Sequence, residues 1–197
     1  MAHYYDANPK GKYAKIKISA TLRGREFNIL SAGGIFSVKH VDNATELLIE
    51  SAKIEEKQRV LDLGCGYGII GIAIKTFFPD CDVVMTDVNK RATHIARQNV
   101  KSSGLDIKVL TGDCYTAIGD ETFDVILTNP PYSAGRSICF TFIDEAFRRL
   151  NAGGTLQLVA RHSKGGKVLS KRMEEVFGSV EATAKKGGFR VYLSKKE

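Results

Sequence analysis

The sequence predicts an α/β fold: a doubly wound, mostly parallel seven-stranded sheet with a closing antiparallel hairpin and a small N-terminal β-hairpin appendage. From residue 59 onward, short apolar runs alternate with helical stretches, which is the pattern of a parallel sheet covered by helices on both faces. The last two apolar runs are separated by only four residues, as in an antiparallel hairpin. The length of 197 residues and the hydrophobic content of 43% suit one globular domain.

The N-terminal segment predicts the appendage. Residues 13–18 and 25–30 show partial alternation of polar and apolar side chains on either side of Arg23-Gly24, which indicates a hairpin. Further along, Asp42-Asn43 offers a cap for a helix over residues 45–52. We therefore expect a β appendage over residues 1–33 and a main domain over residues 34–197.

In the main domain, patterns typical of strands alternate with patterns typical of helices. The pattern gives strands at 59–63, 82–87, 107–110, 123–128 and 155–160, helices at 69–78, 89–104, 139–150 and 167–177, and a closing hairpin from 180–184 and 189–194.

The formal charge of +7 is unevenly distributed. Residues 1–30 carry six Lys and Arg against two Asp and Glu, residues 161–197 carry ten against four, and residues 31–160 carry thirteen against sixteen. A basic excess at both ends of a mildly acidic body indicates a surface for a polyanion such as nucleic acid, although solvated lysines on an ordinary basic protein explain the charge equally well.

Several classes of protein are disfavoured. The four cysteines form no C-x-x-C pair and the four histidines no H-x-x-x-H pair, so we expect neither a structural metal nor a disulfide framework. No apolar run reaches the length of a membrane span, and the N-terminal residues are too polar for a signal peptide. We expect a cytoplasmic protein without a metal ion, whose oligomeric state, monomer or homodimer, is left open.

Three alternate glycines, Gly64, Gly66 and Gly68, follow the first strand of the main domain. Glycine permits a positive φ and lets a ligand approach the backbone, and the helix N-terminus behind the turn offers free N–H donors. A small polar ligand is therefore expected here. Gly66-x-Gly68-x-x-Gly71 also matches the dinucleotide pattern, which by itself is weak evidence for a nicotinamide-dependent oxidoreductase.

A carboxylate follows each of three successive strands. Asp62 suits a ligand with an ammonium group better than a pyrophosphate, and Asp87 can accept from both hydroxyls of a ribose. Asp113 can accept from an adenine amino group. Each aspartate alone could be a helix cap, but the three together predict a nucleoside that carries an amino acid.

The motifs VLDLGCGYG (60–68), TDVN (86–89) and TGD (111–113) resemble those of class I S-adenosylmethionine-dependent methyltransferases, over roughly residues 34–193. The resemblance implies a Rossmann-like methyltransferase fold and S-adenosyl-L-methionine as cofactor. Gly64 and Gly66 would lie against its methionine portion, Asp87 would bind the ribose, and Asp113 with Cys114 would border the adenine. The full set of implied cofactor contacts is Asp62, Gly64, Cys65, Gly66, Tyr67, Asp87, Val88, Asp113, Cys114 and Asn129.

The fourth strand runs into Asn129-Pro130-Pro131-Tyr132. Adjacent prolines stiffen the backbone and remove two N–H donors, so the Asn129 side-chain oxygen and the Pro130 carbonyl could both accept from one NH2 group. The Tyr132 ring could stack on a flat conjugated group. Two acceptors on a planar amine would offset the positive charge that develops on nitrogen during methyl transfer, without a strong base.

This tetrapeptide resembles the N/D-P-P-Y/F motif of amino-group methyltransferases, which act on adenine N6, guanine N2 or the glutamine amide of release factors. The resemblance implies that Asn129, Pro130 and Tyr132 are catalytic.

The surrounding residues narrow the resemblance. Gly34-Ile35-Phe36-Ser37, Val41-Asp42 and the terminal Gly188-Phe189-Arg190-Val191-Tyr192 are similar to the catalytic half of small-subunit ribosomal RNA guanine-N2 methyltransferases, in the small-domain methyltransferase family. These usually have Phe where this chain has Tyr132, and they carry a degenerate N-terminal copy of the domain. The implied acceptor is guanine N2 of ribosomal RNA, flipped out or unpaired. The implied substrate contacts are Phe36, Pro131 and Tyr132. The basic residues Arg136, Arg161, Lys164 and Lys167 follow strand ends on the same sheet edge and are the expected phosphate contacts, although any one of them could equally be a solvated loop charge.

Alternatives remain at this stage. A glutamine-amide N5 methyltransferase of the release-factor type would share NPPY but normally carries a helical N-terminal domain, and an adenine-N6 or transfer-RNA base methyltransferase is also open. The oxidoreductase is disfavoured by Asp62 and by the absence of a Tyr-x-x-x-Lys pair near the site. A non-catalytic RNA-binding protein is disfavoured by the intact Asp87, Asp113 and NPPY.

Overall fold

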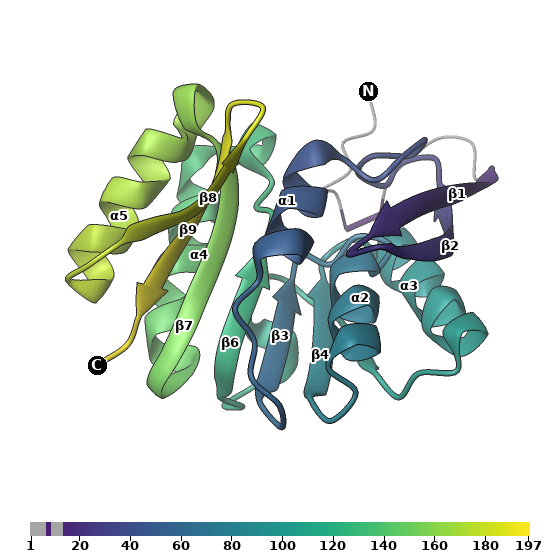
Figure 1. Ribbon diagram of the computed structural model, residues 1–197, viewed down its shortest axis with the longest axis horizontal. Coiled ribbons are helices and arrows are strands. Elements are labelled where there is room, and N and C mark those ends of the chain that lie inside the picture. Colours follow the sequence, from purple (N-terminus) through teal and green to yellow (C-terminus); the bar gives the residue numbers. More distant parts are fainter. Residues whose placement is uncertain (1–6, 9–13) are drawn as a thin grey trace.

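A computed structural model describes residues 7–8 and 14–197. A seven-stranded sheet has the order β5-β4-β3-β6-β7-β9-β8, and a separate two-stranded sheet is formed by β1 and β2 (Figure 1). This arrangement confirms the predicted fold class. Tyr13, at the start of the first predicted strand, and the N-terminal cations Lys10 and Lys12 lie outside the described residues.

The elements alternate along the chain nearly as the sequence predicts. The strands are β1 (Lys15–Leu22), β2 (Arg25–Ala32), β3 (Arg59–Leu63), β4 (Asp82–Asp87), β5 (Lys108–Thr111), β6 (Phe123–Thr128), β7 (Leu150–Arg161), β8 (Glu181–Lys186) and β9 (Phe189–Lys195). The α-helices are α1 (Asn43–Ser51), α2 (Ile69–Phe77), α3 (Lys90–Ser103), α4 (Arg136–Arg149) and α5 (Lys167–Phe177). Short helical turns follow at Thr116–Ile118, Tyr132–Ala134 and His162–Gly166.

The strand order of the sheet reverses between β3 and β6. The chain first places β4 and β5 on one side of β3 and then returns to place β6 and β7 on the other, with all five strands parallel. The β9 strand closes the sheet antiparallel to both β7 and β8. Ligands of open parallel sheets bind at the carboxyl ends of the strands where the order reverses, so β3, β4 and β6 define the position of the site.

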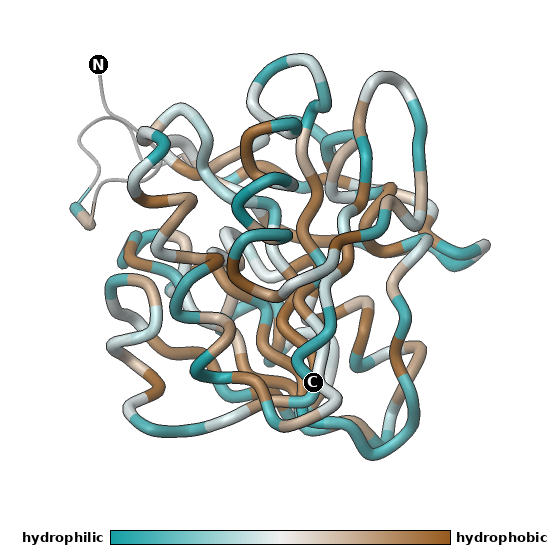
Figure 2. The backbone as a smooth tube through the Cα atoms, turned by 90° about the vertical axis from the view of Figure 1, so that its left-hand side faces the viewer, coloured by the Kyte–Doolittle hydropathy of each residue, from teal (hydrophilic) through white to brown (hydrophobic). Residues whose placement is uncertain are grey.

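The side chains of β3 alternate between two hydrophobic layers. Val60 packs in the layer that contains α1, α2 and α3, whereas Leu61 and Leu63 pack in the layer that contains α4 and α5. Successive residues of a strand point to opposite faces, so these strands are buried on both sides. Figure 2 shows the hydrophobic segments gathered in the interior and the hydrophilic ones in outer loops.

The N-terminal hairpin packs into the first of these layers. Ile18, Leu22, Phe27 and Ile29 are buried in the same hydrophobic cluster as α2 and α3. The buried Asn99 of α3 accepts from the N–H of Leu30 and donates to its carbonyl. The hairpin therefore shares the core of the main domain, and the boundary between residues 33 and 34 stays a prediction.

The largest difference in element bounds concerns α4 and β7. The predicted helix at 139–150 begins three residues earlier, after Gly135, and the predicted strand at 155–160 begins at Leu150. Leu150 pairs with Phe123 of β6, and a register shift between Phe123 and Val125 accommodates the extra residues. Within the described part of the chain, no helix has both the length and the apolar character needed to cross a membrane.

Candidate active site

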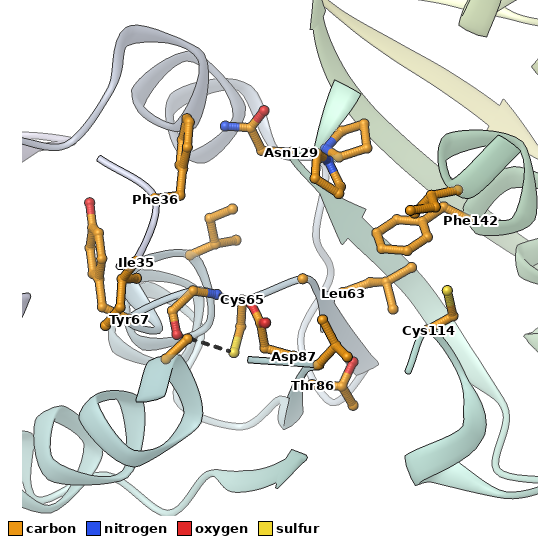
Figure 3. A pocket seen from close by; sticks show the side chains of 18 of the residues that line it. Ile35, Phe36, Leu63, Cys65, Tyr67, Thr86, Asp87, Cys114, Asn129 and Phe142 are labelled. Carbon is orange, nitrogen blue, oxygen red and sulfur yellow. Dashed lines mark hydrogen bonds between the residues drawn. The ribbon is translucent and has the colours of Figure 1, made fainter. Parts of the chain in front are cut away.

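A cavity of about 310 Å³ opens at the carboxyl ends of β3, β4 and β6, where the strand order reverses. Figure 3 shows the labelled Phe36, Asn129, Asp87, Cys114 and Phe142 around it. Its lining residues come from seven separate stretches of the chain. They are Ile35, Phe36, Thr45, Leu63, Gly64, Cys65, Gly66, Tyr67, Ile69, Ile70, Thr86, Asp87, Val88, Ala92, Gly112, Asp113, Cys114, Asn129, Pro130, Pro131, Ile138 and Phe142.

The glycine turn is held by hydrogen bonds to β4. The N–H groups of Gly64 and Cys65 both donate to the carbonyl of Thr86, each at 2.9 Å. Gly68 has a φ of +91° at the cap of α2, and a Cβ there would lie 3.2 Å from Ala96 Cβ. The positive φ favours glycine at this position, and a larger residue would also have to displace Ala96 slightly.

Asp87 forms part of the cavity wall with both carboxylate oxygens anchored. Its Oδ2 accepts from the Gly66 N–H and its Oδ1 from the Asn89 N–H, each at 2.8 Å. Burial raises the pKa of Asp87 to about 6 although these two hydrogen bonds oppose the rise. Each oxygen keeps a free lone pair, so the carboxylate can still accept from two neighbouring hydroxyl groups.

Asp62 is the one expected cofactor contact that does not line the cavity. It shares the strand face of Val60, is fully buried, and its Oδ2 accepts from the Gly71 N–H of α2 at 2.9 Å. Among the residues that the structure describes, none forms a hydrogen bond with its Oδ1. Burial raises the pKa of Asp62 to about 7, and the nearby charge of Asp87 adds to this rise. The alternation of β3 therefore directs Asp62 beneath the glycine turn rather than into the cavity.

Next to the carboxyl end of β5, the cavity is lined by polar groups on one side and by apolar groups on the other. Asp113 and Cys114 follow β5, and the Cys114 thiol donates to Asp113 Oδ1 at 3.3 Å. Burial, and next the hydrogen bond to Asp113, raise the pKa of Cys114 to about 12, so the thiol is protonated at neutral pH. Ile138 and Phe142 of α4 supply an apolar wall beside them.

The Asn129-Pro130-Pro131 segment forms a further wall of the same cavity. The Asn129 amide nitrogen donates to the hydroxyl of Thr45 at 3.0 Å, which leaves the amide oxygen as an acceptor. The Pro130 carbonyl already accepts from the Tyr132 N–H at 2.8 Å, because Pro131, with φ −76° and ψ 74°, forms an inverse γ-turn. One lone pair of that carbonyl remains available.

Tyr132 lies outside the lining of the cavity. The side chain is 37% exposed, and its ring covers Gly165 so closely that a Cβ on this glycine would be 2.1 Å from Tyr132 Cζ. The turn after β7 therefore packs against the ring, and the stacking of Tyr132 on a substrate stays a prediction. This contact joins the NPPY segment to the residues at 162–166.

The four basic residues expected to contact substrate are exposed and lie outside the cavity. Arg136 begins α4 after the NPPY turn, and Arg161, Lys164 and Lys167 lie between the end of β7 and the start of α5. Burial, and then the positive charges of Arg190, Lys167 and Lys185, lower the pKa of His162 in this region. Arg190 and Lys185, which the sequence alone did not single out, therefore add to a positive field at this edge.

Phe36 stands at the mouth of the cavity and is 38% exposed, whereas its neighbour Ile35 is buried. Their loop is tied to α3, since Asn89 Nδ2 donates to the Gly34 carbonyl at 2.9 Å and Arg91 Nη1 donates to the Gly33 carbonyl at 2.5 Å. Asn89 also caps α3, and its backbone N–H donates to Asp87. A single residue therefore holds both the Phe36 loop and the Asp87 carboxylate in place.

Sequence reasoning missed the contribution of α1 and α4. Thr45, Ile138 and Phe142 line the cavity, and Asp42 lies 3.4 Å from the Asn129 amide nitrogen. The spacing of Ile138 and Phe142, four residues apart on one helix face, was the available clue. Among residues 7–8 and 14–197 there is no cluster of three or more His, Cys, Asp or Glu that could hold a metal ion.

Comparison with known proteins adds independent findings. Residues 26–193 match the family model described as methyltransferase small domain. The chain is 34% identical to the uncharacterized protein YbxB of Bacillus subtilis, with 98% of both chains covered. It is 32% identical to ribosomal RNA small subunit methyltransferase C of Actinobacillus pleuropneumoniae, covering 91% of this chain and 55% of that protein.

A solved structure shows the same fold. The 16S rRNA N2 G1207 methyltransferase of T. thermophilus, in complex with AdoMet and guanosine, matches with a TM-score of 0.83 and 25% identity, over 96% of this chain and 52% of that one. The chain thus spans about half the length of these ribosomal RNA methyltransferases and nearly all of the Bacillus subtilis relative.

Proposed function

Because the chain belongs to the methyltransferase small domain family, we propose that it transfers a methyl group from S-adenosylmethionine to an exocyclic base amine of RNA. The proposed acceptor is guanine N2 of ribosomal RNA. The observation that carries this proposal is the position of Asn129-Pro130-Pro131, which forms a wall of the same cavity as Asp87 and Asp113. An array of amine acceptors and a nucleoside site thus share one cavity.

The cavity fits the cofactor in size and in the order of its groups. A volume of about 310 Å³ is at the lower end of the range for small-molecule pockets, ~300–1,000 Å³. Asp87 would bind the ribose hydroxyls, and Asp113, Cys114 and Val88 would border the adenine. Gly64, Cys65, Gly66, Tyr67 and Asn129 would surround the methionine portion, while the buried Asp62 supports the turn from below. S-adenosylmethionine, when bound, supplies a methyl group on a positively charged sulfur.

The chain contributes orientation and charge stabilisation to the reaction. The Asn129 Oδ1 and the free lone pair of the Pro130 carbonyl would each accept one hydrogen of the target amine. These hydrogen bonds strengthen as positive charge develops on nitrogen, so they stabilise the transition state more than the ground state. The proton can leave to water afterwards, because the methylated nitrogen is then cationic and acidic.

The surroundings of the cavity support RNA as the substrate. A base would enter between Phe36 and Pro131, after leaving its stack, since the acceptors lie inside the cavity. Arg136, Arg161, Lys164 and Lys167 would contact phosphates, because they lie on the sheet edge that carries the cavity. Tyr132 would shape the entrance through its contact with Gly165. Ribosomal RNA as substrate implies a cytoplasmic location.

The test is incubation with methyl-labelled S-adenosylmethionine and separated ribosomal RNA, transfer RNA and protein fractions. We expect label in ribosomal RNA, recovered as N2-methylguanosine. Label recovered as N5-methylglutamine would instead establish the release-factor type of reaction. At a saturating concentration of S-adenosylmethionine, the Asn129→Ala variant should lose transfer, and unchanged transfer would contradict the acceptor role.

A further inference from the structure

The amide of Asn129 is oriented by two residues of α1 that lie far from it in the chain. Its Nδ2 donates to Thr45 Oγ1 at 3.0 Å and lies 3.4 and 3.5 Å from the two carboxylate oxygens of Asp42. Thr45 is 5% exposed and lines the cavity, so this contact is sheltered from water. Such shelter strengthens a hydrogen bond and raises the cost of breaking it.

Both groups that face the amide can only accept. The Asp42 carboxylate caps α1, since its Oδ1 accepts from the N–H groups of Ala44 at 3.0 Å and Thr45 at 3.2 Å. The single hydroxyl proton of Thr45 is donated to Asp42 Oδ2 at 2.5 Å, which leaves only lone pairs toward Asn129. If the amide turned over, its oxygen would meet three acceptor oxygens and its NH2 group would face the cavity.

We propose that Asp42 and Thr45 are positioning residues that hold Asn129 with its amide oxygen toward the substrate amine. This inference rests on the proposed function, because the orientation matters only if Asn129 accepts from an amine. A reversed amide would place donors against the hydrogens of that amine and repel it. The helix cap of α1 thus also determines the polarity of the acceptor array.

Three substitutions separate this role from ordinary packing. Thr45→Val keeps the shape but removes the acceptor, Thr45→Ser keeps the hydroxyl, and Asp42→Asn can retain the cap through one oxygen while placing NH2 near Asn129. Ser51→Ala is the matched control, since it removes a hydroxyl of the same helix that donates only to the Leu47 carbonyl. We measure kcat, KM for RNA, the Kd for S-adenosylmethionine and the melting temperature of each.

We expect Thr45→Val and Asp42→Asn to lower kcat, measured at saturating cofactor, by about 10- to 100-fold, and the cofactor Kd to change by a much smaller factor. Thr45→Ser should recover most of the rate lost in Thr45→Val, and Ser51→Ala should equal the wild type. Equal losses in Thr45→Val and Thr45→Ser would overturn the proposal, because packing alone would then explain them.

A second readout does not depend on activity. The side-chain amide protons of Asn129, assigned by NMR in the wild type, should exchange slowly with water and should lose that protection in Thr45→Val but not in Thr45→Ser. Unchanged protection in Thr45→Val would overturn the proposal. Absence of methyl transfer by the wild type to any amine, with the NMR result as expected, would instead refute the proposed function.

Discussion

The titration of Asp87 offers a quantitative test of the cofactor site. Burial raises the pKa of this carboxyl to about 6 in the free protein, against the hydrogen bonds from Asn89 and Gly66. Hydroxyl groups of a ribose would donate much more strongly to the ionised form than to the protonated one. Binding therefore favours the deprotonated carboxylate, so affinity is complete above pH 6 and decreases as the pH falls through that value.

The size of the effect follows from the same pKa. At pH 5, one unit below it, about nine-tenths of the protein carries a protonated Asp87 and must release that proton to bind. The Kd for S-adenosylmethionine should therefore rise about tenfold between pH 7 and pH 5, equivalent to about 1.4 kcal/mol. Asp87→Asn should bind about 10- to 100-fold more weakly at pH 7, because charge-assisted hydrogen bonds contribute about 1.5–3 kcal/mol.

Isothermal titration calorimetry at pH 5, 6 and 7 measures both effects. In Asp87→Asn, the Kd for S-adenosylmethionine should depend little on pH, and any pH dependence that remains comes from other groups such as Asp62. A wild-type Kd that is the same at pH 5 and pH 7, or an equal slope in the variant, would refute the assignment of Asp87 to the ribose.

Three further predictions concern residues around the site. Asp62→Asn should gain stability relative to the wild type as the pH rises from about 4 to 7, by at most about 4 kcal/mol. The reason is that the native carboxyl, with a pKa of about 7, stays protonated over this range while the carboxyl of the unfolded chain ionises. A difference in unfolding free energy between variant and wild type that stays constant over this pH range, measured by urea denaturation, would contradict the prediction. Gly165→Ala should cost about 1–3 kcal/mol more than the control Gly187→Ala, since both have positive φ but only the first meets the Tyr132 ring; equal melting temperatures would show that the ring moves freely. Replacing both Lys164 and Lys167 by Gln should weaken RNA binding and reduce by about 1–2 the slope of the logarithm of the RNA-binding constant against the logarithm of salt concentration. The control Lys57→Gln, at the opposite sheet edge, should change neither quantity. An unchanged slope in the double variant would show that these two lysines do not contact RNA phosphates.

The parts of the fold that depend on local pattern could be predicted from the sequence. The strand, glycine turn and helix from 59 to 78 follow from an apolar run, positive-φ glycines and a second apolar run, all within about twenty residues. The three aspartates lie at strand ends, as expected, because carboxyl ends of parallel strands share one edge. Because side chains alternate along a strand, Asp62 lies beneath the glycine turn, whereas Asp87 lines the cavity. The sequence interpretation placed both of them at the cofactor.

The contacts that join distant segments could not be predicted. Asp42 and Asn129 are 87 positions apart, and nothing in either motif indicates that a helix cap would also bind the amide. The placement of Tyr132 on Gly165 depends on the turn after β7, whose conformation sequence periodicity does not describe. Both features arise from how α1, β6 and β7 pack together, so they required the three-dimensional structure.

Identification of the methylated product tests the central claim most directly. Wild-type protein is incubated with deuterated-methyl S-adenosylmethionine and ribosomal RNA, both naked and in assembled small subunits, and the digested nucleosides are analysed by mass spectrometry. The account predicts deuterated N2-methylguanosine with the wild type and none with Asn129→Ala. Label on another nucleoside, label only in protein, or equal product from the variant would contradict it.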